Sequence, residues 1–98
     1  MIQASTGNAE LRVTGAHGDL VVHRLPQLPV GRTYEMWVQR GSAPPVPTGT
    51  LFSVSSSGTA FVGVPGSLSG VSAVMVTQEP SGGSPAPTTA PLIVARVT

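Results

Sequence analysis

Apolar residues recur at every second position in several short stretches of the chain, which is the spacing of a half-buried β-strand. Leu11 and Val13, for example, alternate with Glu10, Arg12 and Thr14. Glycine, proline or a serine cluster interrupts almost every window of ten residues, and helical periodicity is hard to find. The pattern therefore predicts short strands separated by turns.

The stretch RTYEMWVQR, residues 32–40, is a strand with a clear difference between its two faces. Alternation places Tyr34, Met36 and Val38 on one face and Trp37 on the other. We expect the first face to lie in the core, with Trp37 at least partly outside the layer between the sheets.

Turn signals separate the remaining strand candidates. The connector at 25–31 contains two prolines, which cannot donate to a ladder, and the turn SSSG indicates a hairpin between residues 48–54 and 59–64. Seven or eight short strands at this spacing predict an all-β fold, an antiparallel β-sandwich. We expect residues 1–98 to form one domain, with residues 1–8 as a loose N-terminal segment or an edge strand. Further strands are predicted at residues 9–14, 19–25, 71–79 and 91–98.

Composition narrows the classes of function. Charged residues make up only 9% of the chain and the net charge is +1, against about 25% charged residues in ordinary domains. The charges are scattered along the chain. This argues against nucleic acid as a partner, because the phosphate backbone of a nucleic acid binds clustered basic side chains. Cysteine is absent, which excludes disulfides, thiol catalysis and cysteine-ligated zinc.

Reactive side chains do not converge in the sequence. His17 and His23 stand six residues apart without a third ligand nearby, and GSLSG has Leu68 where a nucleophilic serine would stand. Glu79 has no second carboxylate close to it in the sequence, so it more often caps a turn or pairs with arginine than acts as an acid. We therefore predict that the chain has no catalytic, metal-binding or cofactor-binding residues and is not an enzyme.

Two stretches, LPQLPVGRTYEMWVQRG at 25–41 and VTQEPSGGSPAPT at 76–88, together resemble the C-terminal extracytoplasmic domain of the anti-sigma-K factor family. The resemblance covers roughly residues 9 to 98, and it departs from the family pattern where Thr89 and Ala90 precede Pro91. The resemblance implies structural roles for its signature residues, namely Tyr34, Trp37, Glu79, Pro80, Gly82, Gly83, Ser84, Pro85, Pro87 and Thr88.

Members of the family that this chain resembles have a cytoplasmic domain that holds a sigma factor, one membrane helix, and this domain outside. The resemblance thus implies a non-enzymatic sensory domain on the extracytoplasmic side of the bacterial plasma membrane, in a single-pass membrane protein. It would control cleavage by envelope proteases and release of the sigma factor. The sigma factor and the membrane would be contacted only through parts outside these 98 residues.

The segment EPSGGSPAPT is expected to be a shaped turn rather than a linker. Its two glycines permit positive φ and its prolines fix φ near −65°, and Glu79 can accept backbone N–H groups of the loop. An alternative function is a module that binds cell-wall glycan or another envelope ligand, with Trp37 and neighbouring polar side chains as the contact surface.

Overall fold

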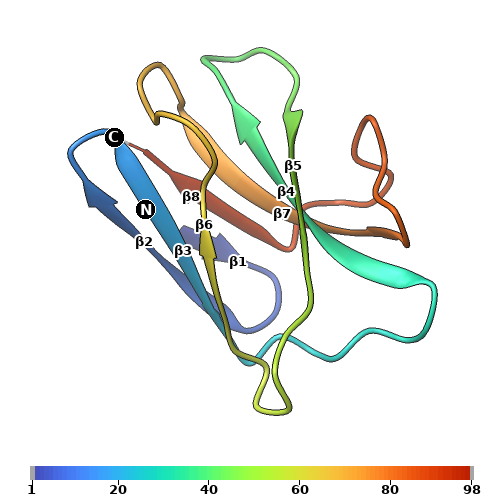
Figure 1. Ribbon diagram of the computed structural model, residues 1–98. Helices are drawn as coiled ribbons and strands as arrows, with labels where there is room; N and C mark the ends of the chain where they lie inside the picture. The colour runs from blue at the N-terminus through green and yellow to red at the C-terminus, as the bar shows by residue number, and fades with distance from the viewer. Residues whose placement is uncertain (1, 98) are drawn as a thin grey trace.

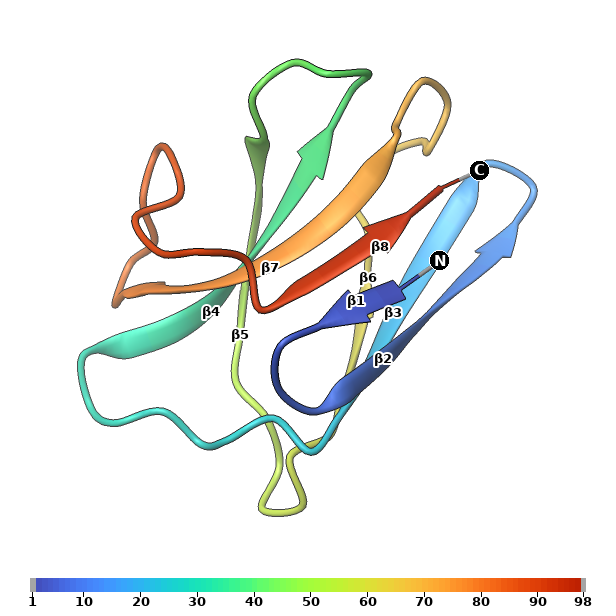
Figure 2. The same cartoon turned by 180° about the vertical axis from the view of Figure 1, so that it is seen from behind.

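The computed structural model describes residues 2–97 as two antiparallel sheets that pack face to face (Figures 1 and 2). The strand order is β1-β8-β7-β4-β5 in the five-stranded sheet and β2-β3-β6 in the three-stranded sheet. The prediction of an all-β antiparallel sandwich is confirmed. The described residues contain no helix, and hence none long and apolar enough to cross a membrane. The strands are β1 (Ile2–Ala4), β2 (Asn8–Thr14), β3 (His17–His23), β4 (Arg32–Gln39), β5 (Val46–Phe52), β6 (Ala60–Gly63), β7 (Ala73–Pro80) and β8 (Ile93–Arg96).

The core between the sheets is built from alternating apolar residues of both. Tyr34, Met36 and Val38 of β4 point into it, as the alternation predicts. Burying a large apolar side chain stabilises a fold by roughly 1.5–3 kcal/mol, so this layer is the main source of stability. The other strands contribute Leu20, Val22, Val62, Val74, Val76, Ile93 and Ala95.

A second apolar cluster lies on the outer face of the five-stranded sheet. It contains Trp37, Ala73 and Met75, with Val94 packed against them. The register sets Trp37 opposite Met75 and Met75 opposite Val94, so the side chains of three adjacent strands meet. Trp37 is therefore outside the layer between the sheets, as predicted, yet its exposure is 0%. The central strand β7 is buried on both faces.

The hairpin predicted between residues 48–54 and 59–64 is wrong. β5 pairs with β4, whereas β6 pairs with β3 in the other sheet. The SSSG turn is tight, with Gly58 N donating to Ser55 O at 2.9 Å, but it carries the chain from one sheet to the other. Gly58 has φ 80°, and its O accepts from Leu25 N at 3.1 Å. This contact with a distant connector holds the crossing in place.

The connector at 24–31 is fixed to β4 by Tyr34. The Tyr34 hydroxyl donates to Pro26 O at 2.6 Å, and its ring stacks on Phe52 with centroids 5.5 Å apart. One side chain thus joins the connector, β4 and β5 at one end of the sandwich.

Candidate functional site

Residues 81–92, called the β7–β8 loop below, connect two neighbouring strands and lie over the outer face of the five-stranded sheet (Figure 2). β7 ends at Pro80, but Leu92 N donates to Val76 O at 2.8 Å, so the chain returns along β7 before β8 begins. The loop is held by the side chains of Glu35 and Glu79, which belong to this outer face. The loop is consequently a folded cover rather than a linker.

Glu79 is the centre of the contacts between the loop and the sheet. Its exposure is 0%, and its carboxylate accepts from Thr88 N at 3.2 and 3.1 Å and from the Thr88 hydroxyl. On the sheet side, the Thr77 hydroxyl donates to Glu79 Oε2 at 2.6 Å, and Trp37 Nε1 donates to Thr77 Oγ1 at 2.8 Å. A continuous chain of hydrogen bonds thus joins the loop to the buried indole.

Strand geometry explains why these side chains meet. Thr77 and Glu79 are two residues apart in β7, so they point to the same face. The register sets Glu35 opposite Thr77 and Trp37 opposite Met75, which makes Trp37 a diagonal neighbour of Thr77. Diagonal neighbours lie about 7–8 Å apart, within reach of a long aromatic side chain.

A second carboxylate holds the middle of the loop. Glu35 is buried, and its Oε1 accepts from Ser84 N at 2.8 Å. Gly83 approaches so closely that a Cβ there would lie 3.1 Å from Glu35 Oε1 and 3.0 Å from Leu51 Cδ2. A side chain at Gly83 would therefore require Glu35 and Leu51 to shift.

Backbone contacts fix both ends of the loop. Ser81 N donates to Gly31 O at 2.8 Å, and the Thr89 hydroxyl donates to Gln78 O at 2.8 Å. Among the described residues, no buried side-chain nitrogen or oxygen lacks a hydrogen-bond partner. The polar groups beneath the loop are satisfied without water or an ion.

The ionised form of Glu79 is favoured by this arrangement. Burial by itself raises the pKa of Glu79, but the hydrogen bonds from Thr77 and Thr88 outweigh burial and lower the pKa below its ordinary value of 4.5. In the described residues no arginine or histidine forms an ion pair with it. Hydrogen bonding alone therefore keeps this carboxylate charged.

The stability of the domain is expected to fall in acid. A carboxylate whose pKa is lowered by folding contributes stability that is present above its unfolded pKa, near 4.5, and lost as the pH falls through the folded pKa. Denaturant melts followed by circular dichroism between neutral and acidic pH measure this loss. Glu79→Gln is the control. The free energy of unfolding should fall less steeply with decreasing pH in this variant than in wild type. An unchanged pH dependence would assign the acid sensitivity to other groups.

The structure gathers most of the signature residues around the loop. Glu79, Gly83, Ser84 and Thr88 meet at the outer face, and Trp37 joins them through Thr77. The remaining signature residues of the loop are Pro80 at the end of β7 and Gly82, Pro85 and Pro87 within the loop, while Tyr34 lies on the opposite, core-facing side of β4.

Sequence reasoning missed the roles of Glu35 and Thr77. Both lie in strands and bind groups that are distant in sequence or on a neighbouring strand. The available signal was the polar pair Thr77 and Glu79 at a spacing of two, directly after the apolar run of β7, because such a pair must find partners when it is buried.

The carboxylates of this site bind a loop of the same chain. The Glu79 carboxylate is occupied by donors from Thr77 and Thr88. His17 lies on another sheet, 3.3 Å from Asp19, where its side chain is exposed. Within residues 2–97 no group of three or more histidine, cysteine or acidic side chains could hold a metal.

Comparison with protein families identifies the chain. The family model described as anti-sigma-K factor rskA, C-terminal, matches residues 3–92. The chain belongs to this family. Neither the comparison with curated proteins nor that with solved structures finds a match.

The family match includes all of the β7–β8 loop and the strands beneath it. It ends at residue 92, the last residue of the loop. Anti-sigma factors regulate transcription through a sigma factor, so membership assigns this domain to a regulatory family with a sigma factor as the implied partner. The resemblance read from the sequence is confirmed.

Gly82 and Gly83 allow a direct test of how tightly the loop is held. Both have positive φ, 92° and 82°, but a Cβ at Gly82 meets open space whereas one at Gly83 meets Leu51 and Glu35. Gly82→Val should lower the free energy of unfolding by roughly 1–3 kcal/mol through backbone strain. Gly83→Val should have a larger effect because side-chain overlap adds to that strain.

Chemical denaturation measures both variants, and hydrogen exchange across residues 79–88 reports on the loop itself. Slow exchange at Ser84 and Thr88 is expected, because their N–H groups donate to buried carboxylates. Exchange of these amides at unfolded-chain rates in the native domain would contradict an ordered loop.

Proposed function

We propose that this domain is the extracytoplasmic sensory part of a membrane-bound anti-sigma factor, and that its folding stability controls proteolysis and release of the sigma factor. Family membership supports the regulatory role and the sigma-factor partner. The saturated hydrogen bonding of Glu79 supports a domain that acts by conformation, without catalysis. The membrane and the sigma factor are contacted by other parts of the full-length protein.

A protease must bind its substrate as an extended, accessible segment, and a closed sandwich withholds such segments. Cleavage then depends on how often part of the fold opens. The β7–β8 loop is the segment whose opening matters most here, because its amides donate to the buried carboxylates of Glu35 and Glu79. Release of the loop would leave two buried carboxylates without their loop donors and loosen β7.

The observation that carries this proposal is the hydrogen-bond chain from Thr88 through Glu79 and Thr77 to Trp37. It couples the conformation of a surface loop to the central strands, so an event that displaces the loop also weakens the sheet. A signal in the envelope could act at this loop.

The test uses the full-length protein in its host, with a tag at each end. Thr88→Ala removes one donor to Glu79, and Ser56→Ala changes an exposed residue of the 55–58 turn as the matched control. Thr88→Ala is expected to increase the cleaved fragment on immunoblots and the output of a sigma-dependent reporter gene. If Thr88→Ala lowers the stability of the purified domain but leaves cleavage and reporter output unchanged, control by domain opening is wrong.

The glycan-binding alternative has no support from the position of Trp37. An aromatic residue that stacks on a sugar must expose the face of its ring, whereas Trp37 is 0% exposed and its N–H is bound to Thr77. Its burial indicates a structural role.

A further inference from the structure

The domain has four strands at sheet edges, and β2 differs from the other three. β1 has three residues, β6 has four, and β5 contains Pro47 and a register irregularity. Short edges, prolines and bulges are devices that prevent pairing with another chain. β2 has seven residues in continuous register with β3, contains no proline or glycine, and pairs with no other strand in the described residues.

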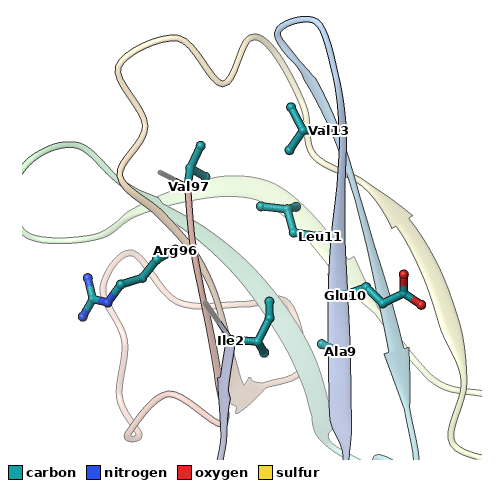
Figure 3. A pocket seen from close by; sticks show the side chains of 7 residues that line it. All are labelled: Ile2, Ala9, Glu10, Leu11, Val13, Arg96 and Val97. Atoms are coloured by element: carbon teal, nitrogen blue, oxygen red, sulfur yellow. The ribbon is translucent and has the colours of Figure 1, made fainter.

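A cleft lined by apolar and charged residues lies beside this free edge. Its volume is about 480 Å³, and it separates β2 from β1 and the end of β8. Figure 3 shows Ile2, Leu11 and Val97 directed into the cleft, while the charged ends of Glu10 and Arg96 point away from it. Val13 at the cleft is 50% exposed. The edge therefore combines backbone groups that pair with no strand with apolar side chains that are only partly buried.

We propose that β2 pairs antiparallel with β2 of a second copy of this chain. The argument is the charge pattern of the strand, NAELRVT, in which Leu11 stands between Glu10 and Arg12. When two such strands pair with Leu11 on the two-fold axis, Glu10 of each copy stands directly opposite Arg12 of the other. Directly opposite charges of opposite sign stabilise paired strands, and like charges destabilise them.

The same charges select this register over its neighbours. Side chains opposite each other must share a face, so the pairing can slip only in steps that preserve the alternation. One such step places Glu10 opposite Glu10, and the step in the other direction places Arg12 opposite Arg12. Only the register centred on Leu11 pairs both charges favourably.

Pairing would also cover the cleft. Ala9, Leu11 and Val13 face the core side of the sheet, so Leu11 would meet Leu11 of the second copy and Val13 would meet Ala9. The two three-stranded sheets would become one six-stranded sheet with an isologous, self-complementary interface.

In the single chain these charges contribute little and are free to re-pair. Arg12 Nε lies 3.4 Å from Glu10 Oε2, with both side chains more than half exposed, and exposed pairs of this kind add little stability. The Arg12 guanidinium also lies 6.0 Å from the ring centre of exposed Phe61. Neither contact is buried, so both side chains can turn toward a second copy.

Sedimentation of the 98-residue chain up to about 1 mM tests the pairing, because weak dimers dissociate in this range. Wild type should form a dimer, and Glu10→Arg and Arg12→Glu should each weaken it at least about tenfold by opposing like charges. An equimolar mixture of the two variants should restore dimers, because the arginines of one then face the glutamates of the other. Neither variant regains the pair within its own strand, so restored dimers can come only from contact between copies. Arg40→Glu, the same charge change at an exposed residue outside β2, should leave the dimer intact.

A chain without cysteine allows a second measurement. Leu11→Cys, on the proposed axis, should be joined to its copy by a short thiol cross-linker, whereas Phe61→Cys on β6 should not. The proposal would be overturned if wild type stayed monomeric at all concentrations measured. It would also be overturned if the mixture of Glu10→Arg and Arg12→Glu dimerised no more tightly than either variant alone. Cross-linking through Phe61→Cys instead of Leu11→Cys would overturn it in favour of the β6 edge.

Discussion

Trp37→Ala is expected to lower the free energy of unfolding by about 3–5 kcal/mol, the range for a fully buried tryptophan. The residue lies outside the layer between the sheets but is covered completely, against Ala73 and Met75. Its loss would leave a cavity in the outer apolar cluster and remove the donor to Thr77. The cause is therefore both lost packing and a shortened hydrogen-bond chain.

Met36→Ala, on the opposite face of the same strand, is the matched variant and should lose about 2–5 kcal/mol. Equal sensitivity of two adjacent residues would show that β4 is buried on both faces. Phe61→Ala, where the ring is 63% exposed, should have little effect on the monomer. Denaturant melts followed by circular dichroism give the three values, and a Trp37→Ala protein close to wild type would contradict the buried position of the indole.

Glu79→Ala is expected to lower the free energy of unfolding by about 3 kcal/mol, because a hydrogen bond to a charged group contributes roughly 1.5–3 kcal/mol and several such bonds are lost together. The donors concerned are Thr88 N, the Thr88 hydroxyl and the Thr77 hydroxyl, and the last can turn to another acceptor. Glu79→Gln retains an acceptor oxygen and should be less harmful.

Hydrogen exchange locates the effect of Glu79→Ala. The acceleration should be largest between Ser81 and Leu92, and amides of β3 that exchange only by global unfolding should accelerate by no more than the loss of stability accounts for. Equal acceleration in the loop and in β3 would show that the loop opens only when the whole domain unfolds, and an unperturbed loop would show that the carboxylate is dispensable.

Local alternation predicted the faces of β4 because a strand permits only two side-chain directions. It could not predict that both faces are buried. Residues 81–92 return over the outer face, and that path is set by contacts from Glu35 and Glu79 to loop amides far along the chain. Polar residues at a spacing of two are compatible with solvent as well as with a buried network.

The failed hairpin has a related cause. Turn chemistry at residues 55–58 determines how the chain reverses, but it does not choose the sheet that receives the next strand. That choice depends on Gly58 meeting Leu25, a contact across more than thirty residues. The family resemblance, by contrast, was readable from the sequence because its signatures are short and specific.

The hydrogen bonds that join Trp37 to Glu79 through Thr77 make the indole a fluorescent reporter of the β7–β8 loop. Trp37 is the only tryptophan in the chain, so the intrinsic fluorescence excited at the indole band comes from one known position. An indole buried in an apolar cluster emits at shorter wavelength than one in water, and displacement of the β7–β8 loop should shift its emission to the red. A ligand or a protease that acts on this loop can thus be followed in the unlabelled protein.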